Sequence, residues 1–527
     1  MKKPLLKTIL ITTLALFSWS NVVNAQTAYM VKDIDPGAGS GLTGNDHFTV
    51  ANNKLFFTAN DGNNGKALWV SDGTAAGTFQ CSFGMTGLCQ YGTGNIGVAG
   101  GSVCFEASTS SAGDEVWASD GTVAGTGLLK DITPGTAGSY PQSFHTINND
   151  VYFVIGSVGN EVLFKSNGTT AGTLYAGSGT GVSYANGIAS YNGAVFYGAT
   201  SSGTVSELRK TTGAAASSTL VKSINATGSN GHLGTLCVSN NILFFTGDDG
   251  VNGRELWKSD GTSTGTVLLK DITAGSGSTN FTEMVDVNGT LFLVVNTAST
   301  GTELWKTDGT STGTAIVKDI NAGTGSSSPA NLINISGTLF FTATDGTGTK
   351  LWKSDGTSAG TVIVYSATST MYIPNKLINV NGTLYFSNSV AIMKSDGTSA
   401  GTVQVAAHGG SGLTYINGTL FFCGGYDAIN GTELWALQIG AAGVNDLKGD
   451  KSPASIYPNP SNGQLFIEST NYKNTTAEIF NIEGALLQSL FLQSAKTTLN
   501  IENLPAGIYF VKVKNAEGVT VKKIVKE

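Results

Sequence analysis

The fold is decided by one stretch of sequence, Glu255-Leu256-Trp257-Lys258-Ser259-Asp260-Gly261-Thr262-Ser263-Thr264-Gly265-Thr266, because this stretch recurs along the chain. A near copy occupies residues 303–314. Aligned on the tryptophan, the copies follow one another in steps of 41 to 48 residues, at Trp69, Trp117, Phe164, Arg209, Trp257, Trp305, Trp352, Met393 and Trp435. Every tryptophan except Trp19 stands at this position, so the chain is a tandem repeat.

Each repeat carries signals for four short strands. An Asn-Gly turn such as Asn288-Gly289 precedes an aromatic-rich strand such as Leu339-Phe340-Phe341. The Leu-Trp strand comes next, and an Asp-Gly-Thr turn leads to a last strand such as 267–272. Asn-Gly and Asp-Gly readily adopt the positive φ of tight hairpin turns. Four strands in roughly 47 residues are typical of a propeller blade.

Burial favours a propeller over a solenoid. Leu256 and Trp257 are adjacent and apolar, and adjacent strand residues point to opposite faces, so both faces must be covered. We therefore expect an all-β propeller whose tryptophans pack between blades. The residues expected to hold the repeat together are Trp69, Trp117, Trp257, Trp305, Trp352, Trp435, Asp72, Asp120, Asp260, Asp308, Asp355 and Asp396.

The two ends of the repeat region predict closure of the ring. Residues 29–34 match the last strand of a repeat, although no repeat precedes them, and the final repeat lacks that strand after Trp435. Pairing the first strand with the last sheet removes an exposed edge. The alignment predicts nine blades. Eight blades, or two smaller rings, stay open because the repeats around Phe164, Arg209 and Met393 are degenerate.

Composition and charge exclude several classes of protein. Glycine accounts for 71 of the 527 residues and charged residues for 12%. The glycines have no three-residue period, and 40% hydrophobic residues are too many for a disordered chain, which excludes collagen and disorder. The net charge of −7 argues against nucleic acid as a partner, because phosphate backbones are bound by basic patches.

The N-terminus predicts a secreted protein. Residues 1–25 read as a signal peptide with lysines at the start, an apolar stretch over 9–19 and a small-residue cleavage site at 23–25. We expect no transmembrane segment in the mature chain. In an oxidising compartment Cys81 and Cys89 are close enough in sequence to form a disulfide, and the sequence leaves this open.

The remaining boundaries follow from composition. We expect a repeat propeller over 26–439, a linker over 440–453 and a small β-sandwich over 454–527, where short alternating strands replace the repeat.

Both regions resemble known families. The Glu-Leu-Trp-x-x-Asp-Gly-Thr phrase resembles the bacterial repeat family named after that string, which implies a secreted or surface protein and no particular reaction. The C-terminal module resembles the type A sorting domain of the type IX secretion system, on Tyr457-Pro458-Asn459-Pro460, on Gly507 and Tyr509 in Leu-Pro-Ala-Gly-Ile-Tyr, and on Lys522-Lys523 near the end. That resemblance implies export across the outer membrane of a Gram-negative bacterium by the type IX machinery, followed by release or surface attachment.

No catalytic, cofactor or metal signature stands out. The recurring aspartates either cap their own turns or bind calcium, and we expect turn capping because Asn167 and Thr212 replace them. A glutamate recurs at one position of the repeat, which suggests glycosidase chemistry because glycosidases use paired carboxylates. These glutamates are Glu115, Glu207, Glu255, Glu303 and Glu433. A residue copied around a ring gives near-equivalent environments, so we expect these glutamates at blade edges, facing solvent or a neighbouring blade.

The functional prediction is a non-catalytic binding or adhesion scaffold for an extracellular glycan or protein. The alternative is a secreted polysaccharide-degrading enzyme. Binding faces of repeat scaffolds lie on loops, and the non-repeat loop 81–97 is the first place to look.

Overall fold

The computed structural model describes two units, which divide the chain after Ile439. The described residues are 27–44, 48–63, 65–82, 84–85, 88, 96–156, 161–177, 187–201, 205–225, 233–366, 374–425, 429–439, 454–469, 472–473, 475–481, 486–515 and 518–527. The predicted signal peptide and linker lie outside them. No described segment forms a helix of the length and hydrophobicity needed to cross a membrane.

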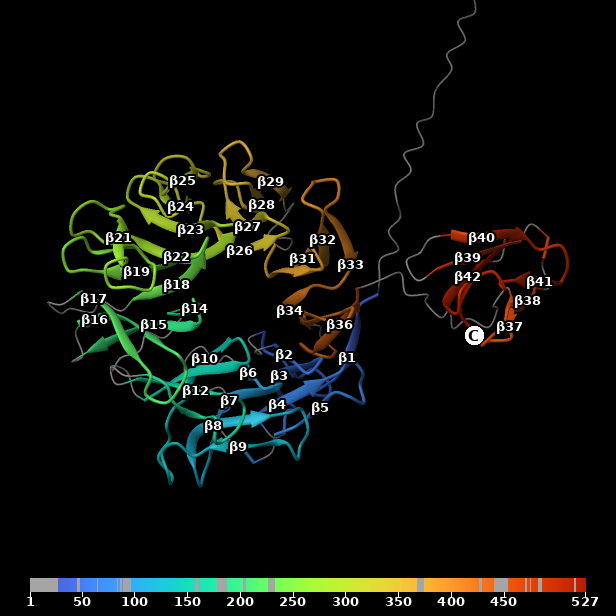
Figure 1. Cartoon of the computed structure of the whole chain (residues 1–527), viewed down its shortest axis with the longest axis horizontal. Coiled ribbons are helices and arrows are strands. Elements are labelled where there is room, and N and C mark those ends of the chain that lie inside the picture. The colour runs from blue at the N-terminus through green and yellow to red at the C-terminus, as the bar shows by residue number, and fades with distance from the viewer. Residues whose placement is uncertain are drawn as a thin grey trace, which may run out of the picture. The chain divides into compact units, whose positions relative to one another are not determined.

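The first unit contains nine four-stranded antiparallel sheets, which we call blades 1 to 9 (Figure 1). Blade 1 consists of β2 (Thr49–Ala51), β3 (Lys54–Asn60), β4 (Lys66–Ser71) and β5 (Phe79–Gln80), and blade 2 of β6 (Gly97–Ala99), β7 (Ser102–Thr109), β8 (Gly113–Ser119) and β9 (Thr126–Lys130). Blade 3 consists of β10 (Gln142–Ile147), β11 (Asp150–Ile155), β12 (Val162–Ser166) and β13 (Leu174–Tyr175). Blade 4 consists of β14 (Ile188–Tyr191), β15 (Ala194–Ser201), β16 (Val205–Thr211) and β17 (Thr219–Asn225).

Blade 5 consists of β18 (Gly234–Ser239), β19 (Ile242–Asp248), β20 (Arg254–Ser259) and β21 (Val267–Lys270), and blade 6 of β22 (Asn280–Val287), β23 (Thr290–Thr297), β24 (Gly301–Thr307) and β25 (Ala315–Lys318). Blade 7 consists of β26 (Ala330–Ile335), β27 (Thr338–Thr344), β28 (Thr349–Ser354) and β29 (Val362–Ser366). Blade 8 consists of β30 (Leu377–Val380), β31 (Thr383–Ser387), β32 (Ile392–Ser395) and β33 (Val403–Ala406). Blade 9 combines β34 (Gly410–Ile416), β35 (Thr419–Gly424) and β36 (Leu434–Gln438) with β1 (Tyr29–Lys32).

The ring is closed by the N-terminal strand, as predicted. β1 pairs antiparallel with β36, with Met30 opposite Trp435. The innermost strands contact their neighbours all the way round, including β34 with β2. Lys32 also donates to the Thr78 carbonyl of blade 1 (2.7 Å), the bond that Lys270 of blade 5 makes to Thr314 of blade 6 (2.6 Å). β1 therefore behaves as an ordinary outer strand of blade 9. The alternative of eight blades is wrong because even the degenerate repeats form sheets, and the alternative of two smaller rings is wrong because the inner strands form a single circuit.

The tight turns have the expected backbone. In blade 6 the hairpin turn between β22 and β23 places Asn288 at φ 51° and Gly289 at φ 81°, and such positive values are tolerated by asparagine and glycine.

The tryptophans lie between neighbouring blades. Trp257 of blade 5 is 6% exposed and packs into a cluster that includes Phe196 and Leu208 of blade 4. Its ring nitrogen donates to the Gly247 carbonyl (3.2 Å). The other five tryptophans take equivalent places, Trp69, Trp352 and Trp435 among them.

The second unit is a small two-sheet β-sandwich, as predicted. One sheet runs β37 (Ser455–Tyr457), β38 (Gln464–Glu468), β41 (Lys496–Asn500), and the other runs β40 (Leu486–Phe491), β39 (Thr476–Phe480), β42 (Gly507–Asn515), β43 (Gly518–Lys526). Buried residues from both sheets, including Leu465, Ile479 and Val511, form its core.

Candidate binding site

The recurring aspartate closes its own turn. Asp72 accepts hydrogen bonds from the backbone N–H (2.9 Å) and the hydroxyl (2.8 Å) of Thr74, and that hydroxyl accepts one from the Gly77 N–H (2.9 Å). The Thr78 hydroxyl donates to the Thr74 carbonyl (2.6 Å) and contacts the Ser71 hydroxyl. The same aspartate–threonine bonds recur at Asp120, Asp260, Asp308, Asp355 and Asp396. The repeated phrase therefore encodes a turn whose polar residues satisfy one another.

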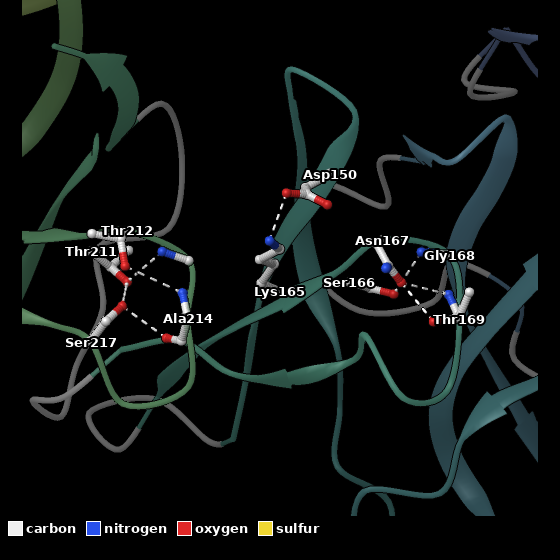
Figure 2. A network of polar contacts seen from close by, with 11 residues as sticks. Asp150, Lys165, Ser166, Asn167, Gly168, Thr169, Thr211, Thr212, Ala214 and Ser217 are labelled. Carbon is white, nitrogen blue, oxygen red and sulfur yellow. Dashed lines mark hydrogen bonds and ion pairs between the residues drawn. The ribbon is translucent and has the colours of Figure 1, made fainter. Parts of the chain in front are cut away.

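The two replacements show what the turn requires (Figure 2). Asn167 keeps both bonds to Thr169, because its side-chain oxygen occupies the place of the carboxylate (3.1 and 2.7 Å). Thr212 retains only a weak 3.5 Å contact with the Ala214 N–H. The acceptor oxygen thus matters more than the negative charge.

The turn carboxylates accept hydrogen bonds from their own turns. The Thr74 hydroxyl is the largest influence on Asp72 and holds the pKa of that carboxyl below its usual value. Within the described ranges, no three His, Cys, Asp or Glu side chains gather into a group that could hold a metal ion. The arrangement gives the turn a structural role.

The repeated glutamates are buried, which corrects the expected placement at blade edges. Glu255 is fully buried and accepts from the Ile272 N–H (2.9 Å), the Thr273 N–H (3.1 Å) and the Thr279 hydroxyl (2.6 Å). It therefore organises the connection from its own blade to the next. Burial raises the pKa of Glu255, while these donors act in the opposite direction. Sequence reasoning missed this role, although the constant spacing from Glu115, Glu255 and Glu303 to an Asp-Ile pair was its signal.

Glu433 makes the same bonds across the junction of the two ends. It accepts from the backbone N–H groups of Ile34 (2.9 Å), Asp35 (3.4 Å) and Gly41 (2.7 Å), almost 400 residues away in sequence. A Cβ on Gly41 would lie 2.7 Å from the carboxylate, so only glycine fits there. Burial raises the pKa of Glu433 to about 7. We call blade 9 together with residues 33–44 the closure seam.

The ring has two faces of different character. Because the four strands of a blade alternate in direction, the connection between the second and third strands and the connection to the next blade emerge at the same end. We call this end the loop face. The Asn-Gly and Asp-Gly-Thr turns lie at the opposite end.

Two connections of blade 8 on the loop face are shorter than their counterparts in blade 5. In blade 5 Phe245 pairs with Trp257 twelve residues later, whereas in blade 8 Phe386 pairs with Met393 only seven residues later. The connection from β33 to β34 is also short: residues 407–409 take the place of the nine residues 271–279 that link β21 to β22. Both deletions open space at the same end of the same blade.

A cavity of about 640 Å³ lies there, at the closure seam. It is lined by Ser40, Leu42, Thr43, Gly44, Asn375, Ser389, Gly410, Ser411, Cys423, Gly424, Gly425 and Thr432, from blades 8 and 9 and from the β1–β2 connection. Its wall is tied across the seam, since the Leu42 N–H donates to the Thr432 carbonyl (3.0 Å) and the Thr432 N–H to the Ser40 hydroxyl (3.1 Å).

The described lining residues are uncharged, and they offer hydroxyl, amide and backbone groups beside the apolar side chains of Leu42 and Cys423. Its size is in the range of small-molecule sites, about 300–1,000 Å³. None of these lining residues is a carboxylate, whereas glycoside hydrolysis generally uses a pair of them. The described lining offers hydroxyl, amide and backbone groups for hydrogen bonds.

No described residue of the predicted loop 81–97 lines this cavity, and most of that loop, Cys89 included, lies outside the described residues. Cys81 is a buried thiol close to the Leu68 carbonyl (3.4 Å).

The motif residues of the C-terminal unit meet on its last strand. Asn459 donates to the Lys523 carbonyl (2.9 Å) and accepts from the Val525 N–H (2.8 Å). Tyr457 donates to Glu468, and Tyr509 to the Pro505 carbonyl (2.8 Å). Pro458 and Pro460 flank Asn459, Gly507 begins β42, and Lys522 and Lys523 are exposed on β43. Asn459 thus ties the first piece of the motif to the last strand, which carries Lys522 and Lys523.

Comparison with known proteins identifies this unit. Residues 455–527 match the family described as the secretion system C-terminal sorting domain, so the chain carries a type IX sorting domain and is a secreted or surface protein. No curated protein matches the chain in sequence.

Solved structures resemble the chain only distantly. They include puromycin hydrolase (TM-score 0.35, 12% identity, 62% of this chain and 58% of that chain) and oligogalacturonate lyase in complex with manganese (0.34, 12%, 56% and 86%). A third is the extracellular domain of a hybrid two-component system from B. thetaiotaomicron (0.32, 9%, 90% and 73%). At such scores we draw nothing from the activities of these proteins.

Proposed function

We propose that this exported propeller is a non-catalytic binding scaffold and that its ligand occupies the cavity at the closure seam. Within this proposal the ring belongs to the Glu-Leu-Trp-x-x-Asp-Gly-Thr repeat class. The signal peptide of the chain is removed after residue 25, and the protein acts outside the cell in adhesion or capture.

The observation that carries the proposal is the place of the cavity. Blade 8 differs from blade 5 by two shortened connections on one face, at residues 388–391 and 407–409. Blades that only keep the ring intact need no such change, whereas a ligand site needs a position unlike its neighbours. The buried glutamates that could have suggested glycosidase chemistry are engaged by backbone N–H groups instead.

The test uses the purified full chain on arrays of glycans and of extracellular proteins, with a release assay on the glycans. We expect saturable binding without release of product. Turnover that a single carboxylate substitution abolishes would contradict the proposal and favour the polysaccharide-degrading alternative. Silence on both arrays, with unchanged adhesion in a deletion strain, would also contradict it.

A further inference from the structure

We infer that the seam cavity takes a neutral, hydroxyl-rich ligand, the end of an uncharged carbohydrate chain. This inference rests on the proposed function and assigns the class of ligand and the groups that contact it.

The first argument is the set of unengaged polar groups. In the described part of the chain, the hydroxyls of Ser389, Ser411 and Thr432 line the cavity without a hydrogen bond to another residue. The side-chain amide of Asn375 uses only its oxygen, which accepts from Ser387. A polar group that loses water on binding needs a partner from the ligand. Hydroxyls donate and accept, so they match the hydroxyls of a sugar.

The second argument is charge. The described residues of the lining include no Lys, Arg, Asp or Glu. A phosphate, a sulfated or carboxylated sugar or a charged peptide end would bury its charge without a partner, and this is costly. The same lining accepts an uncharged sugar without that penalty.

The third argument is that the cavity walls come from both sides of the ring closure. Ser40 and Thr43 come from the N-terminal segment, and Ser411 and Thr432 come from the last blade. A ligand that bridges them also bridges the junction held by Glu433, so binding and ring closure stabilise each other by linkage. This coupling supplies a readout independent of any array.

The decisive variant fills the cavity. Gly425 has no positive φ, and a Cβ there would lie at ordinary contact distance, 3.6 Å, from the carbonyls of Gly409 and Ser389. Gly425→Leu therefore adds bulk to the wall without straining the backbone. Gly127→Leu is the matched control, because Gly127 on β9 of blade 2 also lacks a positive φ and its Cβ would meet nothing within 4 Å.

The experiment measures binding of the full chain and both variants to neutral oligosaccharides, anionic oligosaccharides and peptides, together with hydrogen exchange of residues 29–44. We expect binding to a neutral oligosaccharide, at least tenfold weaker in Gly425→Leu and unchanged in Gly127→Leu. Ser411→Ala should weaken it severalfold. The bound sugar should slow exchange in residues 29–44 of the wild type.

The other outcomes separate the two proposals. Binding of only anionic sugars or only peptides, lost in Gly425→Leu, would overturn the ligand class and leave the binding scaffold standing. Neutral-sugar binding that Gly425→Leu does not affect would overturn the site. Failure of every probe to bind would overturn the ligand class together with the proposed function.

Discussion

Removal of the Glu433 carboxylate should open the ring at one place. Glu433→Ala leaves the N–H groups of Ile34, Asp35 and Gly41 without their acceptor. An unsatisfied buried donor costs about 1–3 kcal/mol. Because the Asp35 bond is long at 3.4 Å, the other two N–H groups carry most of the loss. We expect the junction to lose about 3–5 kcal/mol in total.

The matched control is Glu303→Ala. Glu303 accepts from Ile320 (3.0 Å), Asn321 (3.4 Å) and the N–H of Ser327 (2.9 Å), nearly the same set of bonds as Glu433. These partners lie only 17 to 24 residues away, so the loss should loosen one connection without separating the chain ends. The two variants thus remove similar bonds with different consequences for topology.

The assay is hydrogen exchange by mass spectrometry, supported by limited proteolysis. In Glu433→Ala the amides of residues 29–44 should exchange faster by a factor of about 100 or more, because 3 kcal/mol corresponds to roughly two powers of ten. In Glu303→Ala the change should be confined to residues 319–330. Equal protection of residues 29–44 in Glu433→Ala and the wild type would refute the closing role of the carboxylate.

The remaining predictions concern the turns, the tryptophans, the pH response and export. Asp72→Asn should keep the melting temperature, as Asn167 keeps its turn, whereas Asp72→Ala should cost about 1 kcal/mol in thermal unfolding; equal losses in both would contradict turn capping. Trp257→Ala should cost about 3–5 kcal/mol in denaturant unfolding, because it empties the space between blades 4 and 5, and a loss below 1 kcal/mol would show that the indole is dispensable. The pKa of Glu433, about 7, lies above its usual 4.5, so the folded state holds a proton that the unfolded state releases. Its contribution is complete below pH 4.5 and is lost as pH rises through 7, so the protection factors of residues 29–44, corrected for intrinsic exchange at each pH, should fall between pH 5 and 8, and Glu433→Gln should remove that fall. Deletion of residues 454–527 should keep the protein out of the medium and off the cell surface in fractionation, and undiminished export would contradict the sorting role.

Much of the blade could be predicted from the sequence because its determinants are local. The Asp72–Thr74 turn and the Asn288-Gly289 turn are specified by residues within a few positions of each other. The adjacent large residues Leu256 and Trp257 predicted burial on both faces for the same reason. The glutamates were misplaced because their partners, such as Thr279 for Glu255, belong to a connection whose path is set only when blades pack.

The sequence by itself determined the repeated four-stranded sheet, the spare first strand and the sorting module, since each depends on turn chemistry, on alternation or on a contiguous motif. Only the tertiary structure decided that nine blades close the circle and that Glu433 holds the two ends together. It also decided where the cavity lies, because the shortened connections at 388–391 and 407–409 reach the same end of one blade only when its strands pair. Closure depends on the small angle between neighbouring blades accumulating around the whole ring, and no short stretch of sequence encodes that sum.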